Sequence, residues 1–325
     1  TIYLGGGTPS LLGADGLVRT LDALLERFSP ALGAEITVEA NPDDVSLKAA
    51  RAWRAAGVNR VSIGAQSFDD ESLAWMHRTH TSDQIAMAVE HARAGGIGNV
   101  SLDLIFALPE SLHRCWELDL QRAVELSPDH LSVYGLTVES QTPLGKWRAR
   151  GEVAEASDET YETEFLTAHA ALTAFGYSHY EVSNYARAGQ VARHNSSYWE
   201  RKPYLGLGPA AHGFDGDVRR WNLAPYVAWQ RQCRQAFDPM GGQEVIDGAN
   251  RVAEIVYLGL RTSSGLPCTW LSPNRVELWK AAGWASVDAG RLRLTPEGWL
   301  RLDSLALDLT SEARCDTLTY DATTA

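Results

Sequence analysis

Three polar side chains, Glu39, Gln66 and Asp103, stand at or near the ends of three separate β-forming runs of this sequence. An acid inside an apolar strand, as Asp103 is in SLDLIF, costs free energy unless it is paired or bound to a ligand. Taken singly, each of the three is more simply a satisfied structural polar group. Three such side chains brought together at one end of the fold favour a binding site. Arg78 would add a fixed cation for a carboxylate, although a surface charge is its simpler interpretation.

A triple glycine, Gly5 to Gly7, follows the first β-forming run and precedes Thr8. Glycine permits positive φ and lets a ligand approach the backbone closely, but a tight turn explains an isolated triplet equally well. The stretch has neither the G-x-x-x-x-G-K-[ST] spacing of a phosphate loop nor the G-x-G-x-x-G spacing of a dinucleotide fold. A phosphate is therefore not the ligand that it favours.

The segment RHNSSYW contains His194, Asn195, Tyr198 and Trp199. A lone histidine is usually structural, and the aromatic residues could be ordinary core. Together, a neutral imidazole and flat aromatic faces are what a metalloporphyrin needs, because they supply an axial ligand and π surfaces. The cations nearby that could meet its propionates are Arg193, Arg201 and Lys202.

The composition sets limits on the class of protein. The chain has 325 residues, 45% of them hydrophobic and 22% charged, which suits one large domain and a smaller one. A net charge of -12 argues against nucleic acid as a partner. No apolar run is long enough to span a membrane, and no signal peptide is visible. The cysteines are widely spaced, without zinc or iron–sulfur spacing, so we expect a cytoplasmic protein.

Short β-branched runs alternate with helical patterns over the first half of the chain. Strands are predicted at Ile2–Leu4, Glu35–Glu39, Arg60–Ile63, Val100–Phe106 and Leu131–Tyr134. Between them, apolar residues recur at helical spacing, as from Leu17 to Phe28, and a long helix is predicted to end at Gly176. This alternation indicates right-handed βαβ units and a parallel sheet. In such folds ligands bind at the carboxyl ends of the strands.

After about residue 240 the pattern changes to helix, helix, hairpin, helix. The hairpin is predicted to turn at Asp288–Gly290, and Thr295 with Pro296 marks the start of the last helix. This order is typical of a winged-helix-type unit. Such units often bind DNA, but the acidity of the chain favours a structural cap.

Eight stretches in order carry a resemblance to a known family: YLGGGTPS, VEANPDD, GAQSFDDESLAWMHRTH, SLDLIFALP, HLSVYGLTVE, HYEVSNYA, RHNSSYW and YLGLGPAAHG. They resemble the radical S-adenosylmethionine proteins related to anaerobic coproporphyrinogen dehydrogenase, and within these the HemW branch of heme chaperones, whose HNxxYW signature HNSSYW fits. The resemblance implies an α/β fold, a partial (β/α)6 barrel without its first strand, capped by a winged-helix-like α+β domain. The implied ranges are 1–175 for the barrel, 176–240 for a connecting segment at the heme and S-adenosylmethionine sites, 241–310 for the cap and 311–325 for a tail.

The same resemblance implies roles for individual residues. Those implied to hold S-adenosylmethionine are Gly6, Gly7 and Thr8 at its methionine end, Glu39 at its amino group, Gln66 and Asp103 at its ribose, and Arg78 at its carboxylate. Two further pocket positions are Thr137 and His212. His194 is the implied heme ligand, supported by Asn195, Tyr198 and Trp199.

One departure from the family is large. Its [4Fe–4S] cluster is bound through C-x-x-x-C-x-x-C, upstream of the GGGTP strand, and none of Cys115, Cys233, Cys268 and Cys315 supplies that motif. We therefore expect an N-terminally truncated sequence. The favoured function is a heme chaperone that binds heme and delivers it to apo-haemoproteins. A homodimer is a possible assembly of this chaperone. The alternative is an oxygen-independent coproporphyrinogen III oxidase, so whether the protein is an enzyme stays open.

Overall fold

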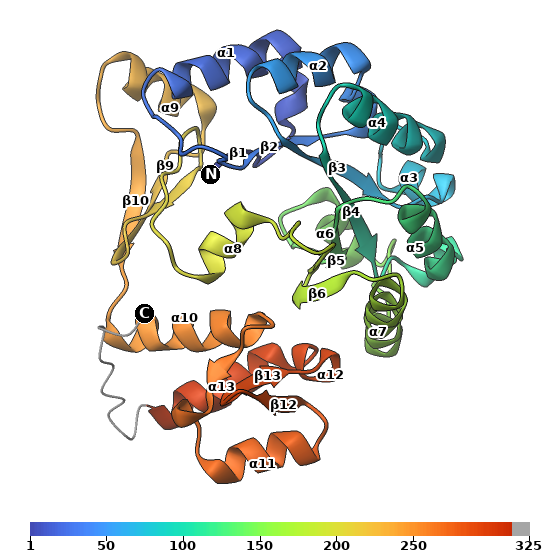
Figure 1. The fold of residues 1–325 in the computed structure, drawn as a ribbon, viewed down its shortest axis with the longest axis vertical. Coiled ribbons are helices and arrows are strands. Elements are labelled where there is room, and N and C mark those ends of the chain that lie inside the picture. The colour runs from blue at the N-terminus through green and yellow to red at the C-terminus, as the bar shows by residue number, and fades with distance from the viewer. Residues whose placement is uncertain (314–325) are drawn as a thin grey trace. The chain divides into compact units, whose positions relative to one another are not determined.

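The computed structural model describes residues 1–313 of the chain (Figure 1). The chain divides into two compact units, Thr1–His194 and a second unit that begins at Asn195. The domain ranges predicted from the sequence stay a prediction, and most of the predicted tail, with Cys315, lies outside the described residues.

A seven-stranded sheet forms the centre of the first unit, in the order β1-β2-β3-β4-β5-β7-β6. Strands β1 to β5 run parallel, and β7 pairs antiparallel with both β5 and β6. The strands are β1 (Ile2–Leu4), β2 (Ile36–Ala40), β3 (Arg60–Gln66), β4 (Asn99–Phe106), β5 (His130–Gly135), β6 (Ser178–Glu181) and β7 (Asn184–Ala186). The predicted α/β class and parallel sheet are confirmed, and β1 and β6 are the edges of the sheet.

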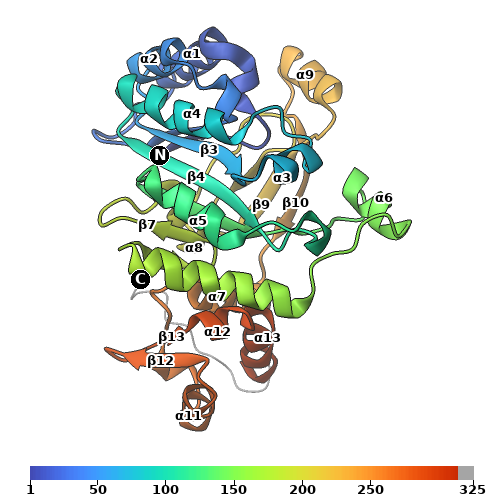
Figure 2. The ribbon, with the colours of Figure 1, turned by 90° about the vertical axis from the view of Figure 1, so that its right-hand side faces the viewer.

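Helices connect the parallel strands, and Figures 1 and 2 show α1, α2, α4, α5 and α7 along one side of the sheet. The helices of this unit are α1 (Gly13–Leu25), α2 (Leu47–Ala55), α3 (Asp70–Trp75), α4 (Ser82–Ala94), α5 (Trp116–Glu125), α6 (Pro143–Ala149) and α7 (Asp158–Ala174). Four of them start at a side chain that accepts a hydrogen bond from the backbone three residues later, namely Ser46, Asp69, Thr142 and Ser157. The long helix before Gly176 is thus confirmed, whereas Phe28 lies beyond the end of α1 and is exposed.

Apolar and polar residues alternate along the strands, so the sheet has one apolar face and one polar face. Val38, Val61 and Val100 are in register on β2, β3 and β4 and are fully buried, as are Leu102 and Leu131 on the same apolar face. Successive residues of a strand point to opposite faces. The other face therefore carries polar side chains, namely Thr37, Glu39, Arg60, Ser62, Ser101, Asp103, His130 and Ser132.

The second unit holds two small antiparallel sheets, β10-β9-β8 and β11-β13-β12. Its strands are β8 (His212–Phe214), β9 (Val218–Asn222), β10 (Met240–Val245), β11 (Leu266–Pro267), β12 (Ala285–Asp288) and β13 (Arg291–Leu294). Its helices are α9 (Tyr226–Arg234), α10 (Gly248–Arg261), α11 (Pro273–Ala281), α12 (Pro296–Trp299) and α13 (Leu302–Ala313), while α8 (Arg193–Trp199) starts in the first unit.

The predicted hairpin and helix start are both present in this unit. Strands β12 and β13 pair around Ala289 and Gly290, both with positive φ. The Thr295 hydroxyl accepts from the backbone of Gly298, and Pro296 occupies the first turn of α12. The local predictions are therefore confirmed.

Candidate functional site

The Glu39 carboxylate lies at the carboxyl end of β2 and is held by a residue of β1 and by the glycine loop after that strand. The Tyr3 hydroxyl donates to its Oε1 at 2.6 Å, and the Gly6 backbone N–H donates to its Oε2 at 3.2 Å. A Cβ on Gly5 would lie 2.4 Å from the Tyr3 ring and 2.8 Å from the Glu39 carboxyl carbon, and Gly6 has φ +80°. The glycines are therefore needed to fold the chain tightly over this carboxylate.

Asp103 stands on β4, on the same polar face. The Ser62 hydroxyl donates to both of its oxygens, at 3.0 and 3.2 Å. Burial raises the pKa of the Asp103 carboxyl to about 6, against the opposing effects of hydrogen bonds from Ser132 and Ser62 and of the Arg60 charge. The group is therefore mostly ionised at pH 7.5 and can accept hydrogen bonds from ligand hydroxyls.

Arg60 places a buried cation beside these acids. Its side chain is 2% exposed, and its Nε has no hydrogen-bond partner in the part of the chain that the structure describes. Its charge also disfavours protonation of His130, whose pKa is held well below the usual value, mainly by burial. His130 links Ser101 and Tyr180 through contacts of 2.8 Å at each ring nitrogen. The polar face is thus an ordered, charged surface.

Gln66 is the last residue of β3, and Arg78 lies further along the chain after α3. Gln66 has φ 67°, a left-handed conformation that is uncommon for a residue other than glycine. Arg78 is half-buried, and no ion pair involves it within residues 1–313. Burial lowers the pKa of its guanidinium, and the Asp43 carboxylate opposes that effect. A ligand carboxylate could form the direct ion pair that Asp43 does not make with it.

A buried ion-pair network supports the loops after β3 and β4. The Asp119 carboxylate accepts from the Ser67 hydroxyl and from the Phe68 backbone, both at 2.7 Å, and pairs with Arg114 at 3.3 Å. Arg114 also pairs with Glu164 at 2.8 Å, and the side chains of Arg114 and Asp119 are 3% and 2% exposed. This network fixes the chain directly after Gln66.

His194 lies against the edge strand β1. The backbone N–H groups of Arg193 and His194 both donate to the Glu35 carboxylate at 2.9 Å. The His194 ring stacks on Tyr3 with centroids 4.8 Å apart, and its Nδ1 is 2.8 Å from the Thr1 hydroxyl. Burial lowers the pKa of the imidazole, and a neutral imidazole is the form that ligates a metal.

The other predicted residues lie in separate places. Thr137 is exposed in the loop after β5, and its hydroxyl is 3.5 Å from the Gly135 carbonyl. His212 begins β8 in the second unit, with its ring 5.8 Å from that of Trp221. The predicted grouping of His212 with first-unit residues stays a prediction. Asn195 also belongs to the second unit, on α8.

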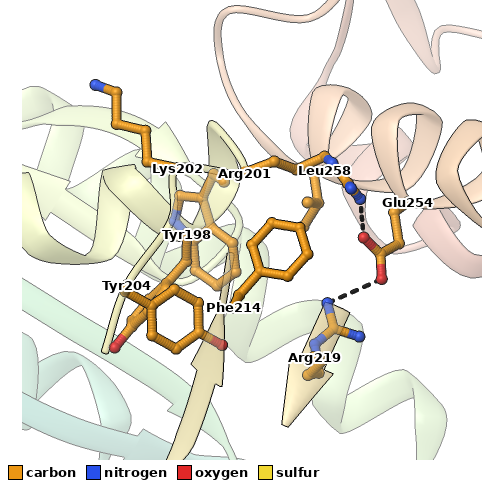
Figure 3. Close-up of a pocket in the computed structure, with 9 residues that line it drawn as sticks. Tyr198, Arg201, Lys202, Tyr204, Phe214, Arg219, Glu254 and Leu258 are labelled. Atoms are coloured by element: carbon orange, nitrogen blue, oxygen red, sulfur yellow. Dashed lines mark hydrogen bonds and ion pairs between the residues drawn. The ribbon is translucent and has the colours of Figure 1, made fainter. Parts of the chain in front are cut away.

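Tyr198 and Trp199 line a cavity of about 220 Å³ within the second unit (Figure 3). The Tyr198 and Tyr204 rings meet edge to face at 4.7 Å. Glu254 on α10 pairs with Arg201 and, at 2.9 Å, with Arg219 on β9. The full lining is Tyr198, Trp199, Arg201, Lys202, Tyr204, Phe214, Arg219, Glu254 and Leu258. The cavity therefore combines flat rings with fixed cations.

Comparison with known proteins identifies the family. The model of the radical SAM superfamily matches residues 1–120. The heme chaperone HemW of Mycobacterium tuberculosis is 36% identical over 312 residues, covering 95% of this chain and 80% of the relative. The heme chaperone HemW of Escherichia coli is 35% identical, covering 94% of this chain and 82% of the relative. The chain belongs to the HemW family of radical SAM proteins.

The fold agrees with this family assignment. Coproporphyrinogen III oxidase (HemN) from Escherichia coli, a radical SAM enzyme, superimposes with a TM-score of 0.77 at 22% identity, over 95% of this chain and 77% of that protein. At this identity the likeness concerns the fold alone. It shows that this chain shares the α/β fold of that protein.

The HemW family assignment raises the question of which residues could hold a metal. Within residues 1–313, no group of three or more His, Cys, Asp or Glu side chains is placed to bind an ion. Cys115, Cys233 and Cys268 are free thiols, far apart in the sequence. The described residues therefore do not fit a [4Fe–4S] cluster. Across that same range, no helix is long and apolar enough to cross a membrane.

The sequence of this HemW-family chain did not reveal several residues of the polar sheet face and of the second-unit cavity. On the first-unit sheet, prediction missed Tyr3, Arg60, Ser62 and His130, although polar residues at every second position of SLDLIF and HLSVYG signal a polar face. In the cavity, prediction missed Tyr204, Phe214, Arg219 and Glu254. Phe214 and Arg219 are register partners on the consecutive strands β8 and β9, but nothing in the local sequence joins them to Glu254 on α10.

Proposed function

We propose that this chain is a heme chaperone, which binds heme with His194 as an iron ligand and delivers it to apo-haemoproteins. The observation that carries the proposal is the identity of 36% to a heme chaperone HemW over 95% of the chain. The HNSSYW segment supports it, because it forms α8 with His194 at its second position. Burial lowers the pKa of the imidazole, which favours the neutral form that an iron ligand needs.

We propose further that S-adenosylmethionine binds at the carboxyl ends of β1 to β4. The Glu39 carboxylate, fixed by Tyr3 and Gly6, would hold the amino group, and Asp103 the ribose hydroxyls. Arg78, which lacks an ion pair within residues 1–313, would hold the carboxylate. The remaining residues proposed for this pocket are Gly7, Thr8, Gln66, Thr137 and His212. In radical SAM chemistry S-adenosylmethionine is a source of a carbon radical, and the residues named here bind and orient it.

Heme titration followed by the Soret band tests the first proposal. His194→Asn removes the iron ligand and should shift the Soret maximum and weaken binding by at least tenfold. His113→Asn is the matched control, because His113 is exposed and its backbone has a left-handed conformation that asparagine tolerates. An unchanged spectrum for His194→Asn would exclude His194 as the ligand.

The alternative function is that of an oxygen-independent coproporphyrinogen III oxidase. Its support is the fold shared with HemN, which at 22% identity does not extend to activity. Turnover of coproporphyrinogen III by the chain together with a reductant and S-adenosylmethionine would reverse the ranking. The homodimer, the apo-haemoprotein partners and the cytoplasmic location stay predictions.

A further inference from the structure

The cavity of the second unit offers two kinds of surface to a ligand. Its aromatic side includes Tyr198, Tyr204 and Phe214, whose rings lie together in Figure 3. The guanidinium carbons of Arg201 and Arg219 lie 5.1 and 5.6 Å from the centre of the Phe214 ring. Flat rings favour a planar apolar group, whereas guanidinium groups favour a carboxylate. The two surfaces together suit an aromatic acid.

Arg219 keeps donors available for such an acid. One of its terminal nitrogens donates to Glu254 at 2.9 Å and the other to Glu244 at 3.0 Å. A guanidinium has five N–H donors, so these two bonds leave others for a further acceptor. The side chain is 31% exposed, which allows a ligand to reach it. Lining cations outnumber lining carboxylates, since Glu254 is the single acid among the residues that line this cavity.

The volume limits how much of a ligand can enter. A cavity of about 220 Å³ is smaller than the roughly 300–1,000 Å³ of pockets that enclose whole small molecules. An edge of a larger planar ligand therefore fits better than a complete macrocycle. A porphyrin with free propionates has such an edge, because its carboxylates project from a flat apolar ring.

We propose that this cavity binds the propionate-bearing edge of a porphyrin, with Arg219 as the main carboxylate-binding residue and Arg201 beside it. The inference rests on the proposed function and adds to it the part of the ligand that lies here. Glu254 has a double role. It orients both guanidinium groups, and its negative charge opposes the entry of a second carboxylate.

The test compares protoporphyrin IX with its dimethyl ester, whose propionates carry no charge, by porphyrin fluorescence. Arg219→Gln should weaken binding of the free acid by about tenfold, the loss expected for one charged hydrogen bond, and leave the ester unchanged. Arg220→Gln is the matched control, because the adjacent residue on β9 pairs with Asp238 instead. It should bind both compounds as the unaltered chain does.

Two further variants make the test sharper. Glu254→Gln removes the competing charge and should tighten binding of the free acid about threefold relative to the ester. Arg219→Lys keeps the charge but loses the planar fork, so it should fall between the unaltered chain and Arg219→Gln.

Equal losses for acid and ester in Arg219→Gln, or no loss for either, would overturn the inference, as would failure of the unaltered chain to bind protoporphyrin IX. Because protoporphyrin IX has no iron, these results are independent of His194. The heme titration can therefore fail while this inference holds, and the reverse is equally possible.

Discussion

The polar face of the first-unit sheet is made by neighbours in register, whereas the second-unit cavity takes its side chains from α8, β8, β9 and α10. On the sheet, Ser62 and Asp103 meet because β3 and β4 are adjacent strands. In the cavity, Arg219 and Glu254 are 35 positions apart in the chain and meet through one ion pair at 2.9 Å. The polar face is set by backbone pairing alone, whereas the cavity needs side-chain contacts with α10 in addition to the pairing of Phe214 with Arg219 across β8 and β9.

The two units also differ in how deeply their ion pairs are buried. Arg114 and Asp119 of the first unit are at most 3% exposed, while Arg219 and Glu244 of the second are 31% and 51% exposed. Removing one partner of a buried ion pair lowers the free energy of unfolding strongly, whereas removing one partner of an exposed pair lowers it little. Substitutions in the buried ion-pair network of the first unit should therefore affect stability strongly. Substitutions around the cavity of the second unit should mainly affect ligand binding.

The largest effect is expected for Asp119→Ala. The change leaves Arg114 with one carboxylate and deprives Ser67 and Phe68 of their acceptor. The free energy of unfolding should fall by about 3–5 kcal/mol, as measured by urea denaturation with tryptophan fluorescence. A loss below about 1 kcal/mol would show that the network does not hold the loop after β3.

A smaller effect that depends on pH is expected for Asp103→Asn. The pKa of about 6 in the folded protein lies above the usual value near 3.8, so the folded state binds the proton more tightly. The free energy of unfolding of the unaltered chain should thus decrease as pH rises from about 4 to 6, by at most about 3 kcal/mol.

Asp103→Asn should remove this decrease, so that the variant is the more stable protein at pH 7.5 and nearly equal to the unaltered chain at pH 4. Urea denaturation across that pH range measures it. A pH dependence identical in both proteins would rule out Asp103 as its source.

The smallest effect is expected for Arg220→Gln in the second unit. Arg220 and Asp238 are 39% and 58% exposed, and water screens their attraction. The free energy of unfolding should change by less than about 0.5 kcal/mol in the same assay. A loss as large as that of Asp119→Ala would remove the contrast between the two regions.

The sequence predicted the sheet well because strand alternation is a local signal. Strand β1 was predicted with its observed bounds, and β4 within one residue. Strand β3 runs past the predicted end at Ile63 to Gln66, with an irregular register before that residue. Such an irregularity depends on pairing with β4, which the local pattern does not contain.

The sites were predictable to different degrees for the same reason. Glu39 was found from its place near a strand end and Asp103 as an acid inside an apolar strand, but Tyr3, which fixes Glu39, resembles any other strand residue. Arg60 looks like an ordinary charge at the start of a run, and its burial follows only from the sheet around it. Glu254 in the cavity reaches Arg201 and Arg219 only through the tertiary packing of α10.

Heme transfer is the most direct measurement of the proposed chaperone function. The chain loaded with heme is mixed with apomyoglobin, with heme-loaded serum albumin as the passive donor, and the Soret band of the acceptor is followed. We expect the chain to bind heme and to pass it to the acceptor faster than albumin does, and His194→Asn to lose this advantage. Transfer no faster than from albumin, or equal transfer by His194→Asn, would contradict delivery through His194.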